Sequence, residues 1–199
     1  MPEEINEQDL KEFFNKGMLA FEKKNYDYAI ELFSQILSSK YDHLEARHYL
    51  HLSLKNKAGN PPQSSITNAI NSINSFFAGM SVEAMLKKDN IPGALESLEK
   101  INAKNPADVR PLKKMSDIFY KKGLIPHAIQ NLEEAKSINA KDIDILKKLG
   151  ELYLKKEDYG NAKSNYEEAL KINPSDSDVL KALKNLDALG TIQQEFGNQ

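Results

Sequence analysis

A fixed repeat of 34 residues constrains the fold of this chain more than any other feature of its sequence. Three alanines, Ala94, Ala128 and Ala162, stand 34 residues apart. Each is followed four residues later by a large side chain and seven residues later by another apolar residue. Such a period indicates one supersecondary unit stacked several times, because a single unit cannot bury its own apolar face. We therefore expect a functional site on the surface of a stack rather than in a catalytic pocket.

The clearest unit covers residues 143–176. Apolar residues recur there at spacings of 3, 4 and 7 in two successive segments, which is the pattern of two amphipathic helices. Residues 156–160 interrupt the pattern between the helices, and Pro174 ends the second helix because proline cannot continue it. The sequence therefore predicts a helix-turn-helix hairpin.

This hairpin resembles the tetratricopeptide repeat (TPR). The signature of that repeat has a Leu-Gly pair and a Tyr in the first helix. A small residue, an aromatic residue, a second small residue and a closing Pro follow. The matching residues here are Leu149, Gly150, Tyr153, Ala162, Tyr166, Ala169 and Pro174. Gly and Ala let the two backbones approach closely, and the aromatic side chains fill the space beside them. The resemblance implies an all-α fold, a right-handed TPR superhelix (α-solenoid) of helix-turn-helix repeats with a C-terminal capping helix.

The pattern divides the whole chain into consecutive segments. We expect an N-terminal lead at 1–9, a repeat at 10–43, an atypical repeat with a long Pro-containing loop at 44–74, a degenerate repeat at 75–108, repeats at 109–142 and 143–176, a capping helix at 177–190 and a tail at 191–199. In the atypical repeat the second helix is expected to start late, near Ile66, and to run into the next unit. The polar face of the last helix suits a cap that closes the core against water.

Composition excludes several classes of function. The 199 residues carry a formal net charge of -2, which gives no bias toward nucleic acid or an anionic membrane. The lack of Cys removes disulfides, thiolate zinc sites and a Cys nucleophile. The apolar runs are far shorter than the roughly 20 residues that span a bilayer, and the acidic start does not resemble a signal peptide. We expect a cytoplasmic protein with no nucleic-acid partner and no membrane insertion.

No sequence pattern typical of catalysis or of cofactor binding is present. The chain has no Gly-rich phosphate loop, nucleophile elbow or HExxH motif. The carboxylate pairs Glu133-Glu134 and Glu167-Glu168 are expected on the outward side of second helices, where no cleft shifts a pKa. The sequence therefore predicts no enzyme, no catalytic residue, no cofactor and no metal.

The histidines have a functional and a structural interpretation. His48 and His51 stand three residues apart on one helix, a spacing that can hold a metal ion. His51, however, takes the place of the close-contact Gly, and Glu45 alone is near as a further ligand, so a structural role is favoured. His127, beside Ala128 at the start of a helix, is expected to be a surface residue.

The resemblance implies that the first helices of the stack line a concave groove. The candidate partner-binding residues follow the close-contact position or lie one turn from it. They are Phe14, Met18, Phe21, His48, Leu52, Phe76, Met80, Arg110, Lys113, Lys114, Lys147, Lys148 and Lys181. Such a groove is apolar at its N-terminal end and basic at its C-terminal end, and it suits a peptide or helix of acidic character from another protein. The alternative is that the aromatic residues pack against neighbouring repeats and the lysines form a solvated face.

Two other functions compete with this groove as interpretations of the sequence. A subset of TPR domains binds acidic C-terminal peptides of chaperones through a clamp of Lys, Asn and Arg on three successive first helices. Lys113, Lys147 and Lys148 offer charge, but Asp117 stands where the clamp needs Asn, so the resemblance does not extend to the clamp. The alternative from another class is structural self-assembly, in which the ends of the stack or the loop near Pro61 form a homo-oligomer without a separate ligand.

Overall fold

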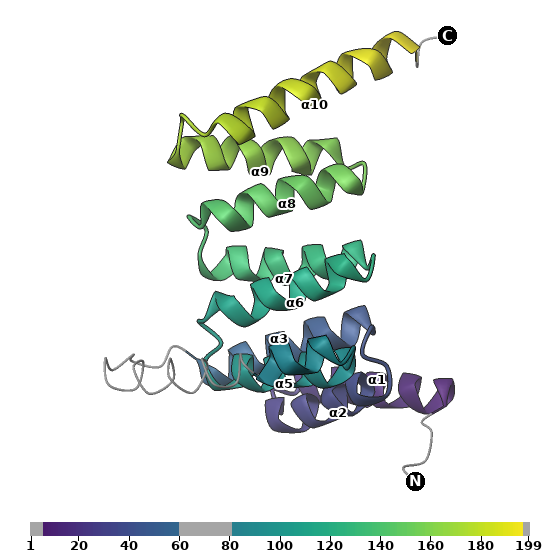
Figure 1. Ribbon diagram of the computed structural model, residues 1–199. Helices are drawn as coiled ribbons and strands as arrows, with labels where there is room; N and C mark the ends of the chain where they lie inside the picture. Colours follow the sequence, from purple (N-terminus) through teal and green to yellow (C-terminus); the bar gives the residue numbers. More distant parts are fainter. Residues whose placement is uncertain (1–5, 60–80, 197–199) are drawn as a thin grey trace, which may run out of the picture. The chain divides into compact units, whose positions relative to one another are not determined.

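Every regular element that the structure describes is a helix. This computed structural model describes residues 6–59 and 81–196, with side chains as far as Ala188. The helices are α1 (Glu7–Glu22), α2 (Tyr26–Ser39), α3 (Leu44–Ala58), α5 (Ile91–Lys104), α6 (Val109–Lys121), α7 (Ile125–Ile138), α8 (Ile143–Lys155), α9 (Tyr159–Ile172) and α10 (Ser177–Phe196) (Figure 1). Residues 81–87, which precede α5, are also helical.

Two helix ends differ from the expected boundaries. The first helix begins at Glu7, inside the expected lead, because the Asn6 side chain accepts a hydrogen bond from the Asp9 backbone N–H at 2.9 Å and the Asp9 carboxylate accepts one from the Asn6 backbone N–H. The last helix continues to Phe196, beyond the expected end at 190. A single glycine, here Gly190, costs a helix only about 1 kcal/mol and does not end it.

The turns between paired helices share one backbone geometry. Lys24, Asp89, Gly123 and Glu157 stand at the same place in their turns and have φ angles of 58°, 53°, 75° and 62°. These left-handed angles let the next backbone N–H reach a carbonyl in the last turn of the preceding helix. The distance is 2.9 Å in two examples, from Asn25 to Ala20 and from Asp158 to Tyr153. The turn that joins residues 81–87 to α5 therefore has the same form as the others.

The chain divides into two compact units, Met1–Met115 and Ser116–Gln199, and the boundary falls within α6. In the first unit, Phe33, Ile36 and Leu50 belong to a core cluster that joins α1, α2 and α3. In the second unit, Leu146, Tyr166, Ala169 and Val179 form a cluster that joins α8, α9 and α10. Each unit thus buries its own apolar faces between successive helices.

Close backbone approach occurs where the sequence predicted it. A Cβ atom added to Gly150 would lie 2.4 Å from a ring carbon of Tyr166, and one added to Gly17 would lie 2.7 Å from Phe33. Burial of the Tyr166 ring in this contact raises the pKa of its hydroxyl to about 12. Glycine at these two positions lets an aromatic ring of the second helix sit directly on the first helix.

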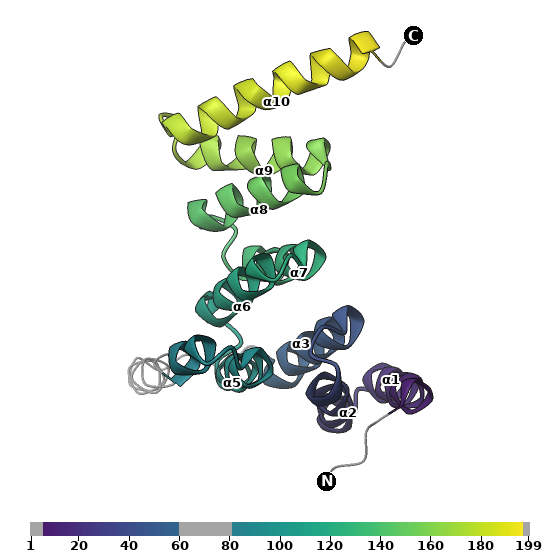
Figure 2. The ribbon, with the colours of Figure 1, turned by 45° about the vertical axis from the view of Figure 1, so that its right-hand side comes forward.

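The contact between α3 and α5 is of another kind. Arg47 and His51 on α3 both bind the carboxylate of Glu99 on α5, and the distance from His51 Nε2 to Glu99 Oε2 is 2.6 Å. A second Arg47 nitrogen donates to the Tyr41 carbonyl at 2.7 Å. Figure 2 shows α5 beside α3. The helix expected to start near Ile66 falls largely outside the described residues.

Candidate functional site

The aromatic groove residues of the first unit are part of its core packing. Phe14 lies 5.8 Å from Phe33, 5.5 Å from His43 and 6.0 Å from Tyr49, measured between ring centroids. Phe21 also contacts Tyr49, at 5.5 Å. Rings at these distances attract one another, and much of their surface is removed from water. This side of the unit therefore presents the edges of a packed aromatic cluster.

The remaining predicted residues of the apolar end differ in exposure. Met18 is half-buried against the same core cluster, and Leu52 is also half-buried. His48 is exposed, with its ring 5.4 Å from that of Tyr49. Phe76 and Met80 lie outside the described residues. The structure thus brings Phe14, Met18 and Phe21 together around one cluster.

Two basic residues predicted for the groove in the first unit are held by neighbouring carboxylates. The Arg110 guanidinium donates to both carboxylate oxygens of Asp108, at distances between 2.6 and 3.0 Å. This hydrogen bonding raises the pKa of Arg110. Lys114 forms an ion pair with Glu83. Lys113 is half-buried. Arg110 and Lys114 would therefore have to give up an existing carboxylate before binding an acidic partner.

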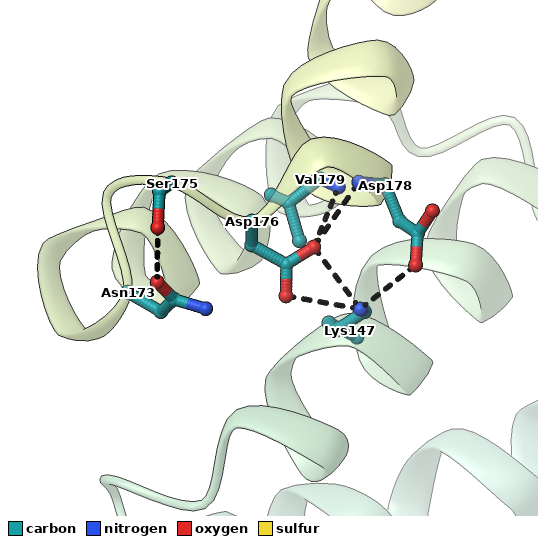
Figure 3. A network of polar contacts seen from close by, with 6 residues as sticks. All are labelled: Lys147, Asn173, Ser175, Asp176, Asp178 and Val179. Carbon is teal, nitrogen blue, oxygen red and sulfur yellow. Dashed lines mark hydrogen bonds and ion pairs between the residues drawn. The ribbon is translucent and has the colours of Figure 1, made fainter.

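Lys147 connects α8 to the start of α10. Its Nζ lies 3.1 and 3.0 Å from the two carboxylate oxygens of Asp176 and 3.4 Å from Asp178 (Figure 3). Asp176 also accepts hydrogen bonds from the backbone N–H groups of Asp178 and Val179, each at 3.2 Å, at the start of that helix. The Lys147 hydrogen bond lowers the pKa of Asp176, and the same bond raises the pKa of Lys147. Lys147 is therefore a structural contact of the capping helix.

The basic residues around Tyr120 form a different arrangement in the second unit. Lys148 Nζ lies 5.2 Å and Lys155 Nζ 5.6 Å from the centroid of the Tyr120 ring. Lys148 is also 3.5 Å from Asp117, which is long for an ion pair, and Lys155 is exposed. Two ammonium groups over one aromatic ring offer cation–π contacts and positive charge together. We call Tyr120, Lys148 and Lys155 the lysine–tyrosine patch.

Sequence reasoning missed Tyr120 in this patch. Tyr120 stands four residues after Ser116, just as Phe21 stands four residues after Gly17, so the repeat register could have identified it. Lys155 lies one turn after Glu151, which follows the close-contact Gly150, so the same repeat register selects it for the groove. Lys181, which was predicted, is exposed on α10. The patch therefore joins two lysines that the repeat register selects to Tyr120, which the prediction missed.

The structure alters the predictions for His127 and for the carboxylate pairs and agrees with a structural role for His51. His127 is buried rather than on the surface, because its ring packs 5.0 Å from that of Phe119. His51 is buried and bound to Glu99, as a structural role requires. One member of each carboxylate pair bridges helices: Glu133 accepts from the Tyr153 hydroxyl at 2.8 Å, and Glu168 pairs with Lys136 at 2.8 Å. Burial raises the pKa of the Tyr153 hydroxyl. The hydrogen bond to Glu133 raises it further, by a smaller amount.

No group of three His, Cys, Asp or Glu side chains that could hold a metal ion occurs among residues 6–59 and 81–196. In the same part of the chain, no helix combines the length and the apolar character needed to cross a membrane. What the described surfaces offer chemically is hydrogen bonding, charge and apolar contact.

Comparisons with known proteins agree with the fold. The family model of the tetratricopeptide repeat matches residues 143–176. The C-terminal part of a TPR repeat-containing protein from Cytophaga hutchinsonii is similar with a TM-score of 0.55 and 18% identity, over 90% of this chain and 72% of that chain. The first TPR of Spaghetti (RPAP3), solved with the HSP90 peptide SRMEEVD, gives a TM-score of 0.51 and 13% identity, over 58% of this chain and 92% of that one. No curated protein sequence matches.

These findings establish the fold. Residues 143–176 are a tetratricopeptide repeat, and the chain has the all-α fold of tetratricopeptide repeat proteins. The predictions of the family resemblance and of the fold class are thus confirmed.

Proposed function

We propose that this chain is a protein-interaction module that binds an acidic segment of a partner protein through the lysine–tyrosine patch. The observation that carries the proposal is the position of the Lys148 and Lys155 ammonium groups, 5.2 and 5.6 Å from the ring of Tyr120. A carboxylate approaching the patch meets two cations, and apolar atoms of the partner can lie on the exposed part of the ring.

The patch is a narrower proposal than a basic groove along the whole chain. Arg110, Lys114 and Lys147 already hold carboxylates of this chain, so a partner gains less by pairing with them. Lys155 is exposed and has no ion pair among the described residues. The chaperone-tail clamp is not part of the proposal, because Lys147 is bound to Asp176 and Asp117 stands where the clamp needs Asn. The similar RPAP3 structure holds an acidic peptide, which is compatible with such a role for the fold.

The experiment uses a fluorescein-labelled peptide of alternating glutamate and leucine and the full chain. Reversal of charge in Lys148→Glu/Lys155→Glu should weaken binding at least tenfold, about 1.4 kcal/mol, and remove most of the salt dependence. Fluorescence anisotropy at two salt concentrations measures both. The control Lys171→Glu/Lys184→Glu makes the same change of net charge on exposed positions of α9 and α10. Equal weakening in the two variants would mean that the peptide responds to overall charge, and the patch would not be the site.

A second candidate function is self-assembly through the first hairpin. Leu19 on α1 and Tyr28 on α2 are 55% and 45% exposed, so this hairpin presents apolar side chains to water. Burial between two copies would remove this surface from water. Sedimentation across a range of concentrations tests the proposal against the variant Leu19→Lys. A chain that stays monomeric at every concentration removes this candidate.

A further inference from the structure

A cavity of about 350 Å³ lies between α2, α3 and α5 in the first unit. Its walls are largely apolar and include Ile30 and Leu37 from α2, Leu50 and Leu54 from α3, and Leu95 from α5. Leu50 and Leu95 are 3% and 1% exposed, so the cavity reaches into the layer of the buried core. Its volume is within the range of roughly 300–1,000 Å³ typical of small-molecule sites.

In the second unit, two polar bridges join the helices at the matching positions of α7, α8 and α9. Tyr153 on α8 donates to Glu133 on α7 at 2.8 Å. Lys136 on α7 pairs with Glu168 on α9, also at 2.8 Å. Four polar side chains thus link these helices.

The residues at the same repeat positions in the first unit cannot make either bridge. At the positions of the Tyr153–Glu133 bridge the first unit has Leu54 and Ser34. At the positions of the Lys136–Glu168 bridge it has Leu37 and Lys100. All four line the cavity. Ser34 faces Leu54, and Leu37 faces Lys100. Neither pair can form a polar bridge, so the space stays unfilled and its walls stay largely apolar.

The floor of the cavity carries charge that is already paired. Arg47, at 1% exposure, and Glu99 both line the cavity. One Glu99 oxygen binds Arg47 and the other lies 2.6 Å from His51. A charged ligand would have to break this buried network, which is costly because a buried ion without its partner loses both water and counter-charge. A neutral ligand leaves the network intact.

We propose that the cavity between α2, α3 and α5 binds a small, neutral, mainly apolar molecule. The apolar walls supply the affinity, since burial of such a ligand removes apolar surface on both sides from water. This site is separate from the acidic segment of the proposed function and does not depend on it.

The probe for the test is N-phenyl-1-naphthylamine, a neutral apolar molecule whose fluorescence rises in apolar surroundings. The full chain should bind it saturably with one-to-one stoichiometry. The anionic relative 8-anilinonaphthalene-1-sulfonate should bind at least tenfold more weakly, because its sulfonate would meet the paired charges of Arg47 and Glu99. Equal affinity for the two probes would overturn the assignment of a neutral ligand.

Transfer of a bridge from the second unit tests the location. The double variant Ser34→Glu/Leu54→Tyr introduces the Tyr–Glu pair of positions 153 and 133, and should lower probe affinity at least tenfold while helix content is retained. Leu54→Met is the matched control, because it keeps the wall apolar and should bind normally. Ser34→Phe, which fills the cavity from its rim, should also weaken binding and serves if the double variant fails to fold.

Two further outcomes would overturn the proposal. One is a folded wild-type chain that shows no saturable probe binding. The other is unchanged affinity in a folded variant that fills the cavity. The patch variant Lys148→Glu/Lys155→Glu should bind the probe normally, so failure of the proposed function and failure of this inference can be told apart.

Discussion

The contact of α8 with α9 and that of α3 with α5 solve one packing problem by different chemistry. In the first, Gly150 lies under the ring of Tyr166, and shape complementarity holds the helices. In the second, Arg47 and His51 stand at the repeat positions of Leu146 and Gly150, and both bind Glu99. A repeat position therefore fixes where a side chain lies but leaves open how it is stabilised.

Loss of Glu99 should have the largest effect on the free energy of unfolding. Glu99→Ala leaves Arg47 buried without its counter-charge, so we expect a loss of about 3–5 kcal/mol in the free energy of unfolding. Glu167 stands at the same repeat position in α9 and is exposed, so Glu167→Ala should change stability by at most about 0.5 kcal/mol. Urea unfolding of both variants measures the difference. Similar losses would show that the network contributes no more than a surface carboxylate.

The second-largest loss of stability is expected where a side chain is added at the close contact of Gly150 with Tyr166. In Gly150→Ala the new methyl group would meet the Tyr166 ring at 2.4 Å, and the overpacking should cost about 1–3 kcal/mol. Because each repeat contacts only its neighbours, amide exchange should accelerate mainly in α8, α9 and α10. Exchange that accelerates equally in α1 would contradict packing by separate neighbouring contacts.

A smaller effect is expected from the bridge between α7 and α8. Tyr153→Phe removes the hydroxyl that donates to Glu133 and should destabilise the second unit by about 0.5–1.5 kcal/mol. The control Tyr159→Phe alters a tyrosine whose hydroxyl has no hydrogen-bond partner among the described residues. Thermal unfolding would distinguish them. A Tyr153→Phe variant as stable as the wild type would mean that the hydrogen bond between Tyr153 and Glu133 does not stabilise the contact of α7 with α8.

The smallest effect concerns the Lys147 contact with Asp176 and depends on pH. The pKa of Asp176 in the folded chain is lowered, so its stabilising contribution is present above the ordinary value of 3.8 and is lost as the pH falls through the lowered pKa. Asp176→Asn should keep a helix cap but lose the ion pair. The gap in melting temperature between wild type and variant should therefore be open at pH 7 and should narrow progressively as the pH falls below 3.8. A gap that does not narrow below this pH would exclude the carboxylate charge as its cause.

Periodicity predicted the core better than it predicted the surface. Ala94 and Ala162 are completely buried, as their spacing required, because burial of a periodic position depends only on local helix geometry. The role of Lys147 could not be predicted in this way, because its partner Asp176 lies 29 residues further on and comes close only in the folded unit. Arg47 did carry a signal that went unused, since a charged residue at an otherwise apolar repeat position calls for a buried partner.

The contact of Arg47 with Glu99 joins residues 52 positions apart, whereas Gly150 and Tyr166 are 16 apart. Each doubling of a closing loop adds roughly 0.6 kcal/mol of entropic cost, so closing 52 residues rather than 16 costs about 1 kcal/mol more. Local hairpins should therefore form first and this contact late, with the result that changes at Glu99 mainly speed unfolding and hardly slow folding.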